Sequence, residues 1–339
     1  MLQHYHRLVL SVGSVNKLLP IPGVADHARG LHGIPEALYL RDHIARQVEM
    51  AVAAVDPAER AARSTFVVVG AGYTGTETAA HGVLFTDALA DQHHLPSGAR
   101  PRWLLLDVAD RVLPGLHPRM SRAAERVLLG RRVDVRTGVS VKEATAEGVQ
   151  LTDGEFVSTR SLIWCVGVRP DPLVADLGLE LSHGRLVVED DLTIPGHPEA
   201  YACGDAAAVP DLTRAGEFTA MTAQHAVRQG RLAARNIAAS YGTGHRRRYR
   251  HYDLGFVVDL GGMAAAANPL DLPISGLPAK TVTRGYHLLS MPTNRLRVAA
   301  DWSIDALLPR QAVQLGLVGA IPVDSASPEV VSPHEAIIA

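Results

Sequence analysis

Three closely spaced glycines in the first third of the chain have the pattern of a phosphate-binding loop. Gly70, Gly72 and Gly75 directly follow the apolar run 66–69 and precede a segment of helical character. In such a loop the first glycine permits a tight turn, the second lets the backbone approach a pyrophosphate, and the third lets the helix pack closely on the strand. The phosphates would lie at the helix N-terminus. A turn that merely connects a strand to a helix needs one or two glycines, so this context predicts a dinucleotide-binding loop.

An acidic residue ends the next strand-like run. Asp107 follows the apolar residues 103–106. A carboxylate at this place would accept hydrogen bonds from an adenosine ribose and would repel a 2′-phosphate, which favours NADH over NADPH. Asp107 lies further from Gly75 than the usual separation of about twenty residues, and the extended segment 81–100 would absorb the difference. The alternative is a solvated aspartate at a strand end.

The surrounding elements alternate as a parallel sheet covered by helices requires. Strand-like runs are expected at 7–14, 66–70, 103–107, 133–136, 149–152, 156–159, 162–165, 201–205 and 256–260. Helical patterns are expected at 35–62, with an interruption near Pro57, and at 76–90, 118–129 and 219–240. The alternation of strand and helix after residue 66 predicts the α/β class.

The composition is that of an ordinary globular chain. Its 339 residues are 47% hydrophobic, and 33 basic residues nearly balance 35 acidic ones. This length allows two domains, and the near-neutral charge argues against nucleic-acid binding. The basic run 245–251 is interpreted as a solvated loop. The sequence has neither the apolar core of a signal peptide nor a membrane-spanning run, so we expect a cytoplasmic chain.

The two cysteines limit the redox chemistry. Cys165 and Cys203 are too far apart in the sequence for a Cys-x-x-Cys pair or a zinc cluster, so no metal site is expected. Without a cysteine pair, the chain has no internal disulfide that could accept electrons.

Four further motifs, in their order along the chain, carry a resemblance to a known family. They are 8–14, with Ser11 and Val12 in the usual Ala and Thr places, then 164–170, 202–206 and 223–229. Together with the glycine loop they resemble the FAD-dependent pyridine nucleotide oxidoreductases, and most of all the type II NADH dehydrogenases (NADH:quinone oxidoreductases), over nearly all of the chain.

The resemblance implies an α/β fold with two dinucleotide-binding, Rossmann-like, three-layer domains. The NAD(H)-binding domain, 59–179, would be inserted in an FAD-binding domain made of 1–58 and 180–255. A C-terminal segment, 256–339, would form an interface or associate with a membrane. The implied cofactors are FAD and NAD(H).

The resemblance also assigns roles to single residues. Asp205 would bind the flavin ribitol, because a Gly-Asp turn offers a carboxylate acceptor to a hydroxyl group; a plain turn is the alternative. The expected cofactor-binding residues are Gly13, Gly70, Gly72, Gly75, Asp107, Gly167, Gly204, Asp205, Ala223 and Gln224. Gln224 and Gln229 would lie between the flavin ring and the quinone entry, although glutamines on an alanine-rich helix are often only solvent-exposed helix formers.

Glu77 and Gln224 are the expected catalytic residues. Glu77 occupies the family position of an acidic side chain where nicotinamide meets flavin, and it would order this interface or relay protons. A carboxylate early in a helix is also simply stabilised by the helix dipole. In this interpretation NADH passes hydride to the flavin, and a quinone then accepts the electrons.

The C-terminal region resembles the membrane-docking region of the family. The segments 286–289 and 296–317 are apolar, and arginines stand nearby at 284, 295, 297 and 310. This pattern suits peripheral contact with an anionic membrane, here the inner face of the cell membrane, and the arginines at 246–248 could assist it. The alternative is that these residues pack on the protein's own domain or on a second copy in a homodimer.

The sequence departs from the family at its start. The first glycine loop, which holds the FAD pyrophosphate in the family, is absent, so we expect an N-terminally truncated FAD-binding domain. Two other functions follow as alternatives. One is a non-catalytic remnant that binds NADH, and the other is a flavoprotein reductase of a small iron-sulfur protein, which would favour a basic docking face.

Overall fold

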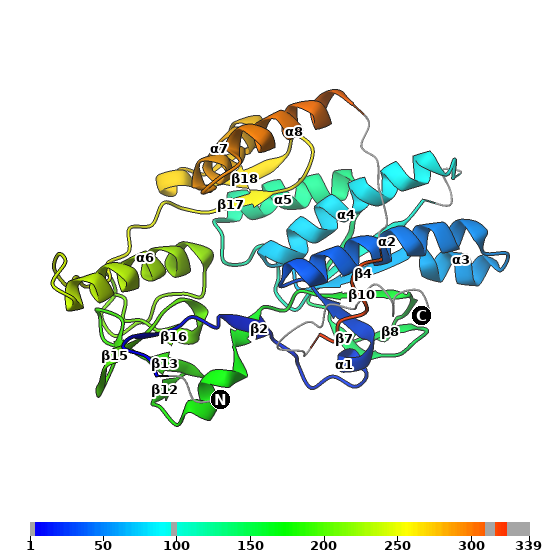
Figure 1. Ribbon diagram of the computed structural model, residues 1–339. Helices are drawn as coiled ribbons and strands as arrows, with labels where there is room; N and C mark the ends of the chain where they lie inside the picture. The colour runs from blue at the N-terminus through cyan, green and yellow to red at the C-terminus, as the bar shows by residue number, and fades with distance from the viewer. Residues whose placement is uncertain (1–3, 96–99, 309–315, 324–339) are drawn as a thin grey trace. The chain divides into compact units, whose positions relative to one another are not determined.

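The computed structural model describes residues 4–95, 100–308 and 316–323. The described residues form two compact units, shown in Figure 1. The smaller unit consists of residues 4–17 and 168–253, and the larger unit contains the rest. Each unit is described by itself.

A five-stranded parallel sheet is the centre of the larger unit. Its strands, in spatial order, are β3 (Ala28–Gly30), β10 (Ser161–Trp164), β4 (Thr65–Val69), β5 (Arg102–Asp107) and β6 (Asp134–Thr137). All five residues of β4 are buried. A parallel sheet is covered on both faces, which explains why residues 66–69 of β4 are all apolar.

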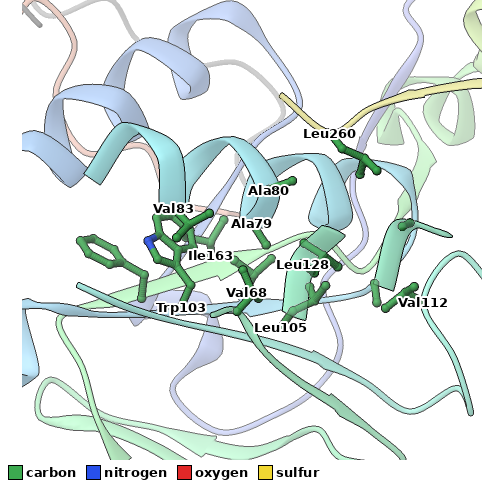
Figure 2. Close-up of a cluster of buried hydrophobic side chains, with 14 of the residues drawn as sticks. Val68, Ala79, Ala80, Val83, Trp103, Leu105, Val112, Leu128, Ile163 and Leu260 are labelled. Carbon is green, nitrogen blue, oxygen red and sulfur yellow. The ribbon is translucent and has the colours of Figure 1, made fainter. Parts of the chain in front are cut away.

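Helices cover one face of this sheet, as Figure 1 shows. They are α2 (Ile34–Ala53), α3 (Pro57–Arg63), α4 (Tyr73–Gln92) and α5 (Pro118–Gly130). Side chains alternate between the faces of a strand, so Phe66 and Val68 of β4 point toward the helices. The Phe66 ring stacks on Trp103 with 4.8 Å between ring centroids. Trp103 lies beneath α4 in Figure 2. Its Nε1 donates a 3.0 Å hydrogen bond to Thr86 of this helix.

A small antiparallel sheet covers the opposite face. Its strands are β7 (Val141–Ala144), β8 (Gly148–Leu151) and β9 (Phe156–Ser158), and α1 (Val24–His27) lies beside it. Val67 and Val69 of β4 join Val149 and Leu151 of β8 in a second buried cluster. The larger unit therefore has three layers, and the α/β class with a parallel sheet predicted from the sequence is confirmed.

The C-terminal residues begin with a sheet that packs on α4 and α5. Its strands are β17 (Val257–Asp259), β18 (Ala265–Ala267) and β19 (Ile274–Ser275), followed by α7 (Leu277–Ser290) and α8 (Arg295–Leu307). Val258, Leu260 and Ala266 join the core on the helical side of the parallel sheet. None of the helices in the described ranges is long and apolar enough to span a membrane.

The smaller unit joins the start of the chain to its middle. Its strands are β1 (Leu8–Leu10), β2 (Ser14–Asn16), β11 (Val168–Pro170), β12 (Leu181–Ser182), β13 (Arg185–Val187), β14 (Thr193–Ile194), β15 (His197–Ala202) and β16 (Ala207–Ala208). Its helices are α6 (Ala223–Ser240) and two short 3₁₀ segments, Pro172–Leu177 and Gly204–Ala206. β1 pairs in parallel with β15, and β2 pairs antiparallel to β11.

The compact units differ from the domain boundaries expected from the sequence. Residues 18–58 lie in the larger unit because β3 pairs with β10 and α2 contributes to the same core. Residues 168–179 lie in the smaller unit because β11 pairs with β2. Residues 254–308 lie in the larger unit because their first strands share its core.

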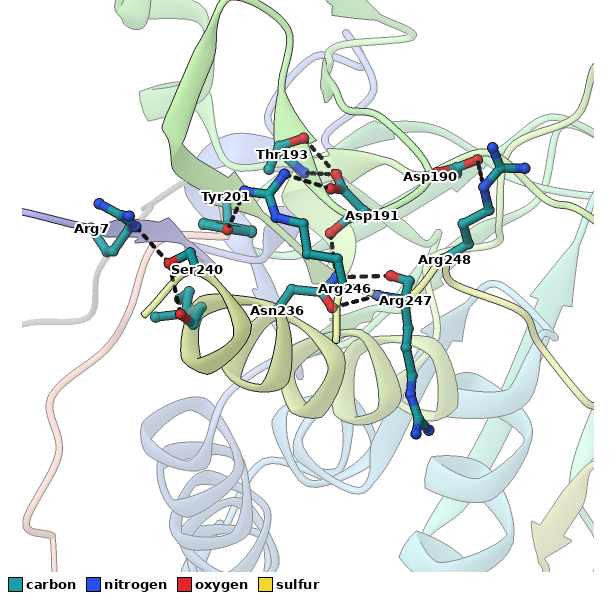
Figure 3. A network of polar contacts seen from close by, with 11 residues as sticks. Arg7, Asp190, Asp191, Thr193, Tyr201, Asn236, Ser240, Arg246, Arg247 and Arg248 are labelled. Carbon is teal, nitrogen blue, oxygen red and sulfur yellow. Dashed lines mark hydrogen bonds and ion pairs between the residues drawn. The ribbon is translucent and has the colours of Figure 1, made fainter. Parts of the chain in front are cut away.

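The basic run at 245–251 is held against the smaller unit. Arg246 pairs with Asp191 at 3.1 Å and donates to the Tyr201 hydroxyl, and Arg248 pairs with Asp190 at 3.1 Å, as Figure 3 shows. The run is thus partly neutralised by its own unit rather than solvated throughout.

Close packing of α4 on the sheet yields a stability prediction. A Cβ at Gly82 would lie 2.2 Å from the Trp103 ring. We expect Gly82→Ala to lower the free energy of unfolding by about 1–3 kcal/mol, because overpacking forces the core to shift. Thermal unfolding followed by circular dichroism measures the effect. The matched control is Gly130→Ala at the end of α5, where a Cβ meets nothing within 4 Å, and an equal loss in both variants would contradict the packing account.

Candidate cofactor sites

The glycine loop lies between β4 and α4. Gly70 has a φ of +100°, and a Cβ there would lie 2.3 Å from the carbonyl oxygen of Cys165. A Cβ at Gly75 would lie 1.8 Å from the carbonyl oxygen of Gly70. The loop is therefore so tight that only glycine fits at its first and third positions, as the motif predicts.

Gly72 has a different reason to be glycine. It is the N-cap residue of α4, with a φ of −70°, and a Cβ there would meet no protein atom within 4 Å. The fold does not require glycine at this position. A Cβ would instead fill the space beside the helix N-terminus, where backbone N–H groups lack intrahelical partners. This is the space that a pyrophosphate would need, so the loop fits a dinucleotide.

Asp107 is held against the same loop. Its carboxylate accepts hydrogen bonds from the N–H of Ala71 at 2.5 Å and from the N–H of Ala109 at 2.8 Å. The aspartate is half-buried at the end of β5. Each carboxylate oxygen has two lone pairs, so these bonds fix the orientation of Asp107 and leave it able to accept another hydrogen bond.

Glu77 lies early in α4 and is half-buried. One of its oxygens accepts a 2.7 Å hydrogen bond from the N–H of Asp259 in β17. Burial raises the pKa of Glu77 above the usual carboxyl value, and the hydrogen bond from Asp259 opposes this only in part.

Two residues beside Glu77 were not found from the sequence. Lys280 of α7 is 4% exposed and contacts the Asp259 carboxylate at 2.5 Å, and His81 contacts the same carboxylate at 3.4 Å. Burial by itself would raise the pKa of Asp259. The hydrogen bonds from His81 and Lys280 outweigh burial and hold this pKa well below its usual range. His81 lies one helical turn after Glu77 in α4, whereas Asp259 and Lys280 come from a distant part of the chain. Only tertiary structure brings Asp259 and Lys280 to this place.

The Gly-Asp turn of the smaller unit follows β15. Gly204 has a φ of +73°, and Asp205 accepts a 2.7 Å hydrogen bond from the Ser14 hydroxyl. The turn thus joins the motifs at 8–14 and 202–206, which are far apart in the sequence. Gly13, with a φ of +77°, precedes Ser14 and lies next to this contact in the chain.

Gln229 of α6 supports this turn. It is 1% exposed, accepts a 2.8 Å hydrogen bond from the N–H of Gly204, and donates a 3.0 Å bond to Thr219. Both ends of its amide are therefore engaged inside the unit. The structure thus buries Gln229 rather than leaving it as a solvent-exposed helix former.

The N-terminus of α6 is close in sequence to this support. Thr222 caps the helix by accepting from the N–H of His225, which is why the helix begins at Ala223 rather than at 219. Ala223 is exposed and Gln224 is half-buried. The first N–H groups of a helix favour negative charge, so this end suits an electron-rich cofactor edge.

Arg185 is a further residue that the sequence did not indicate. It donates a 2.8 Å hydrogen bond to the carbonyl oxygen of Thr219. Burial lowers the pKa of Arg185, and the charge of Asp205 opposes this shift. A half-buried cation near Asp205 adds positive potential to the turn.

The expected site residues thus fall into two groups. The larger unit brings together Gly70, Gly72, Gly75, Glu77 and Asp107, and the smaller unit contains Gly13, Gly204, Asp205, Ala223, Gln224 and Gln229. Gly167, with a φ of +97°, is the last residue of the larger unit before the chain enters the smaller one. Across the described ranges no group of three or more His, Cys, Asp or Glu residues could hold a metal ion.

Both cysteines are free thiols in buried surroundings. Burial raises the pKa of Cys165 to about 12, and it also raises the pKa of Cys203. A thiolate is the reactive form, so neither residue is prepared for nucleophilic or disulfide chemistry.

A parallel sheet with a tight glycine loop, together with a Gly-Asp turn supported by a helix, defines a nucleotide-dependent oxidoreductase fold. A model of the pyridine nucleotide-disulphide oxidoreductase family matches residues 3–230, and the chain belongs to this family. The resemblance stated from the sequence is confirmed.

Several relatives carry a more specific name. The chain is 28% identical over 313 residues to the type II NADH:quinone oxidoreductase NdhA of Mycobacterium tuberculosis, covering 88% of this chain and 66% of NdhA. It is 33% identical to an NADH dehydrogenase-like protein of the same species, covering 69% of this chain and 56% of that protein. The chain therefore spans about two thirds or less of the length of these relatives.

The fold has a counterpart among solved structures. The structure of NDH2 from Plasmodium falciparum in complex with NADH has a TM-score of 0.83 with 15% identity, covering 92% of this chain and 80% of that one. A ferredoxin reductase from Rhodopseudomonas palustris has a TM-score of 0.59 with 21% identity, covering 78% of this chain and 64% of that one. At these identities the likeness concerns the fold.

The raised pKa of Glu77 gives a pH-dependent prediction. A carboxyl whose pKa is higher in the folded than in the unfolded state binds more protons when folded, so it lowers stability as pH rises from its unfolded pKa through its folded pKa. Glu77→Gln removes this loss and keeps an oxygen for the Asp259 N–H. We expect the variant to gain on the order of 2 °C in Tm at pH 8 and less at pH 5.

The control for this experiment is Glu143→Gln. Glu143 is exposed on β7, and its replacement should change Tm equally at both pH values. If Glu77→Gln showed its larger gain at pH 5, or no dependence on pH, the Glu77 carboxyl would not have the raised pKa.

Proposed function

We propose that this chain is an FAD-dependent NADH dehydrogenase that uses a quinone as electron acceptor. The observation that carries the proposal is that one chain holds both a tight glycine loop with an oriented Asp107 and a Gly-Asp turn bonded to Ser14. The names of its relatives agree, since NdhA is a type II NADH:quinone oxidoreductase. Bound FAD would supply the chemistry of accepting hydride from NADH and passing electrons to the quinone.

The larger unit is proposed to bind NAD(H). The open space at Gly72 lets the backbone approach the pyrophosphate at the start of α4. Asp107, already oriented by the Ala71 and Ala109 N–H groups, would accept a hydrogen bond from the adenosine ribose. Its negative charge disfavours a 2′-phosphate, which supports NADH as the substrate.

The smaller unit is proposed to bind FAD. Asp205 would accept a ribitol hydroxyl, and Ser14 holds the carboxylate in place. Gln229 would act as a positioning residue, because its amide holds the N–H of Gly204. Since that amide is engaged, we propose that Gln224 rather than Gln229 is the glutamine that meets the quinone.

Glu77 is proposed to hold a proton near the reacting nicotinamide. Its raised pKa means that the carboxyl keeps its proton to a higher pH than an exposed glutamate does. The ion pair between Lys280 and Asp259 fixes the strand whose N–H binds Glu77. The Glu77 carboxyl therefore has both a fixed position and a raised pKa.

Peripheral membrane contact is proposed for the C-terminal helices. Leu289 of α7 is 71% exposed and Leu296 of α8 is 89% exposed, with Arg295 and Arg297 beside the latter. Exposed apolar side chains with flanking arginines suit an anionic bilayer surface, on the inner face of the cell membrane. A homodimer that covers the same residues is the competing occupant, and sedimentation with and without vesicles separates the two.

Retention of FAD tests the flavin assignment. After incubation with FAD and desalting, the visible spectrum should show bound flavin, and Asp205→Asn should weaken FAD binding about tenfold or more through loss of a charge-assisted hydrogen bond. Asp176→Asn is the control, since Asp176 is exposed in the same unit. Equal retention by both variants would remove Asp205 from the proposed site.

NADH oxidation tests the whole reaction. With FAD and a short-chain quinone, the chain should oxidise NADH, and Gly72→Ala should lower kcat/KM for NADH at least tenfold while Tm stays within about 1–2 °C, because its Cβ would meet the nucleotide and not the protein. NADH binding without turnover would identify a non-catalytic protein. Turnover with a small iron-sulfur protein but not with a quinone would overturn the acceptor.

A further inference from the structure

The larger unit contains a cavity that the proposed reaction does not use. It has a volume of about 520 Å³ and lies between α5 and β19. None of Gly70, Gly72, Gly75 and Asp107 lines it. Its size is within the usual range for small-molecule sites, which is about 300–1,000 Å³.

Three arginines give this cavity its charge. Arg119, Arg122 and Arg126 all line it and are all exposed. Their spacing of three and four residues places them on one face of α5. Glu125 is the acidic residue among the lining side chains, so positive charge dominates the wall.

The arginines lack the carboxylate partners that others in this unit have. Arg100 pairs with Asp87 and Asp91, Arg102 with Asp134, Arg132 with Asp87, and Arg136 with Asp134 and Glu155. Within the described part of the chain, no ion pair is formed by Arg119, Arg122 or Arg126, and Arg126 Nε donates only to the carbonyl oxygen of Arg122. Like charges at this spacing repel each other, so the three arginines lower the stability of α5.

The position of Arg119 near the start of α5 lowers the stability of the helix further. Arg119 is the second residue of α5, whose first turn has no acidic residue. Cations near a helix N-terminus oppose the helix dipole, whereas an anion there is stabilised. A bound anion would relieve both the repulsion among the arginines and the conflict with the dipole.

Apart from Glu125 and Ser275, the rest of the cavity wall is apolar. Leu129, which is 54% exposed, and the segment Pro273–Ile274 stand beside the arginines. Bare inorganic phosphate would leave this surface in water. A ligand with an anionic group and an apolar body would cover it.

We propose that this cavity binds an organic phosphate, with the phosphate on Arg119 and Arg122 and the apolar body over Leu129 and Ile274. A guanidinium group can donate two parallel hydrogen bonds to two oxygens of one phosphate, which suits such a site. A free phosphate ester and a phospholipid headgroup share this chemistry. The site does not depend on the bound flavin or on turnover.

Titration with 1-naphthyl phosphate, followed by its fluorescence, tests the proposal on the full chain. We expect saturable binding that weakens at high salt and becomes at least tenfold weaker in the double variant Arg119→Gln/Arg122→Gln. The matched control is Arg231→Gln/Arg235→Gln, which removes the same charge from exposed positions on α6 and should leave binding unchanged. Gly72→Ala should also bind normally, which separates this cavity from the glycine loop.

Vesicles distinguish the source of the phosphate. Binding to phosphatidylglycerol vesicles but not to phosphatidylcholine vesicles, lost in the α5 double variant, would identify a lipid headgroup even if naphthyl phosphate did not bind. Arg119→Lys/Arg122→Lys keeps the charge and should recover part of the binding. If neither probe bound, or if both bound equally well to the α5 double variant and to the α6 control, the proposal would be overturned.

Discussion

The close approach of α4 to the parallel sheet is the constraint on which the larger unit depends. At two positions of this helix, a side chain larger than that of glycine would collide with a neighbouring group. A Cβ at Gly75 would meet the Gly70 carbonyl, and a Cβ at Gly82 would meet the Trp103 ring. This contact sets where the helix begins and therefore where its N-terminal N–H groups face. The geometry of the helix N-terminus, which we propose binds the pyrophosphate, thus follows from the packing of the core rather than from the loop alone.

The acidic residues of both units are oriented before any ligand arrives. Asp107 accepts two backbone N–H groups, Asp205 accepts the Ser14 hydroxyl, and Glu77 accepts the N–H of Asp259. A carboxylate fixed in this way loses less conformational entropy when a sugar hydroxyl or a proton reaches it. Two further residues support these carboxylates indirectly. Gln229 accepts a hydrogen bond from the N–H of Gly204, which precedes Asp205, and Lys280 pairs with Asp259, whose N–H binds Glu77.

Much of this could be predicted from the sequence, because the signals are local. The valine run, the glycine spacing and the Gly-Asp turn each depend on neighbouring residues, and the structure contains each of them. The division into units could not be predicted in the same way, since β3 joins the sheet through pairing with a strand more than a hundred residues later. Lys280 and Arg185 were missed for the same reason. The burial of Gln229 could not be predicted either, because the spacing of Gln224 and Gln229 does not reveal which face of the helix is buried.

The central claim is that NADH reduces a flavin bound to this chain. The most direct measurement is to load the protein with FAD, remove excess cofactor and oxygen, and follow the visible flavin band while NADH is added. The account predicts that the band disappears with about one equivalent of NADH and returns when a quinone is added. A bound flavin whose band does not change with NADH would contradict it.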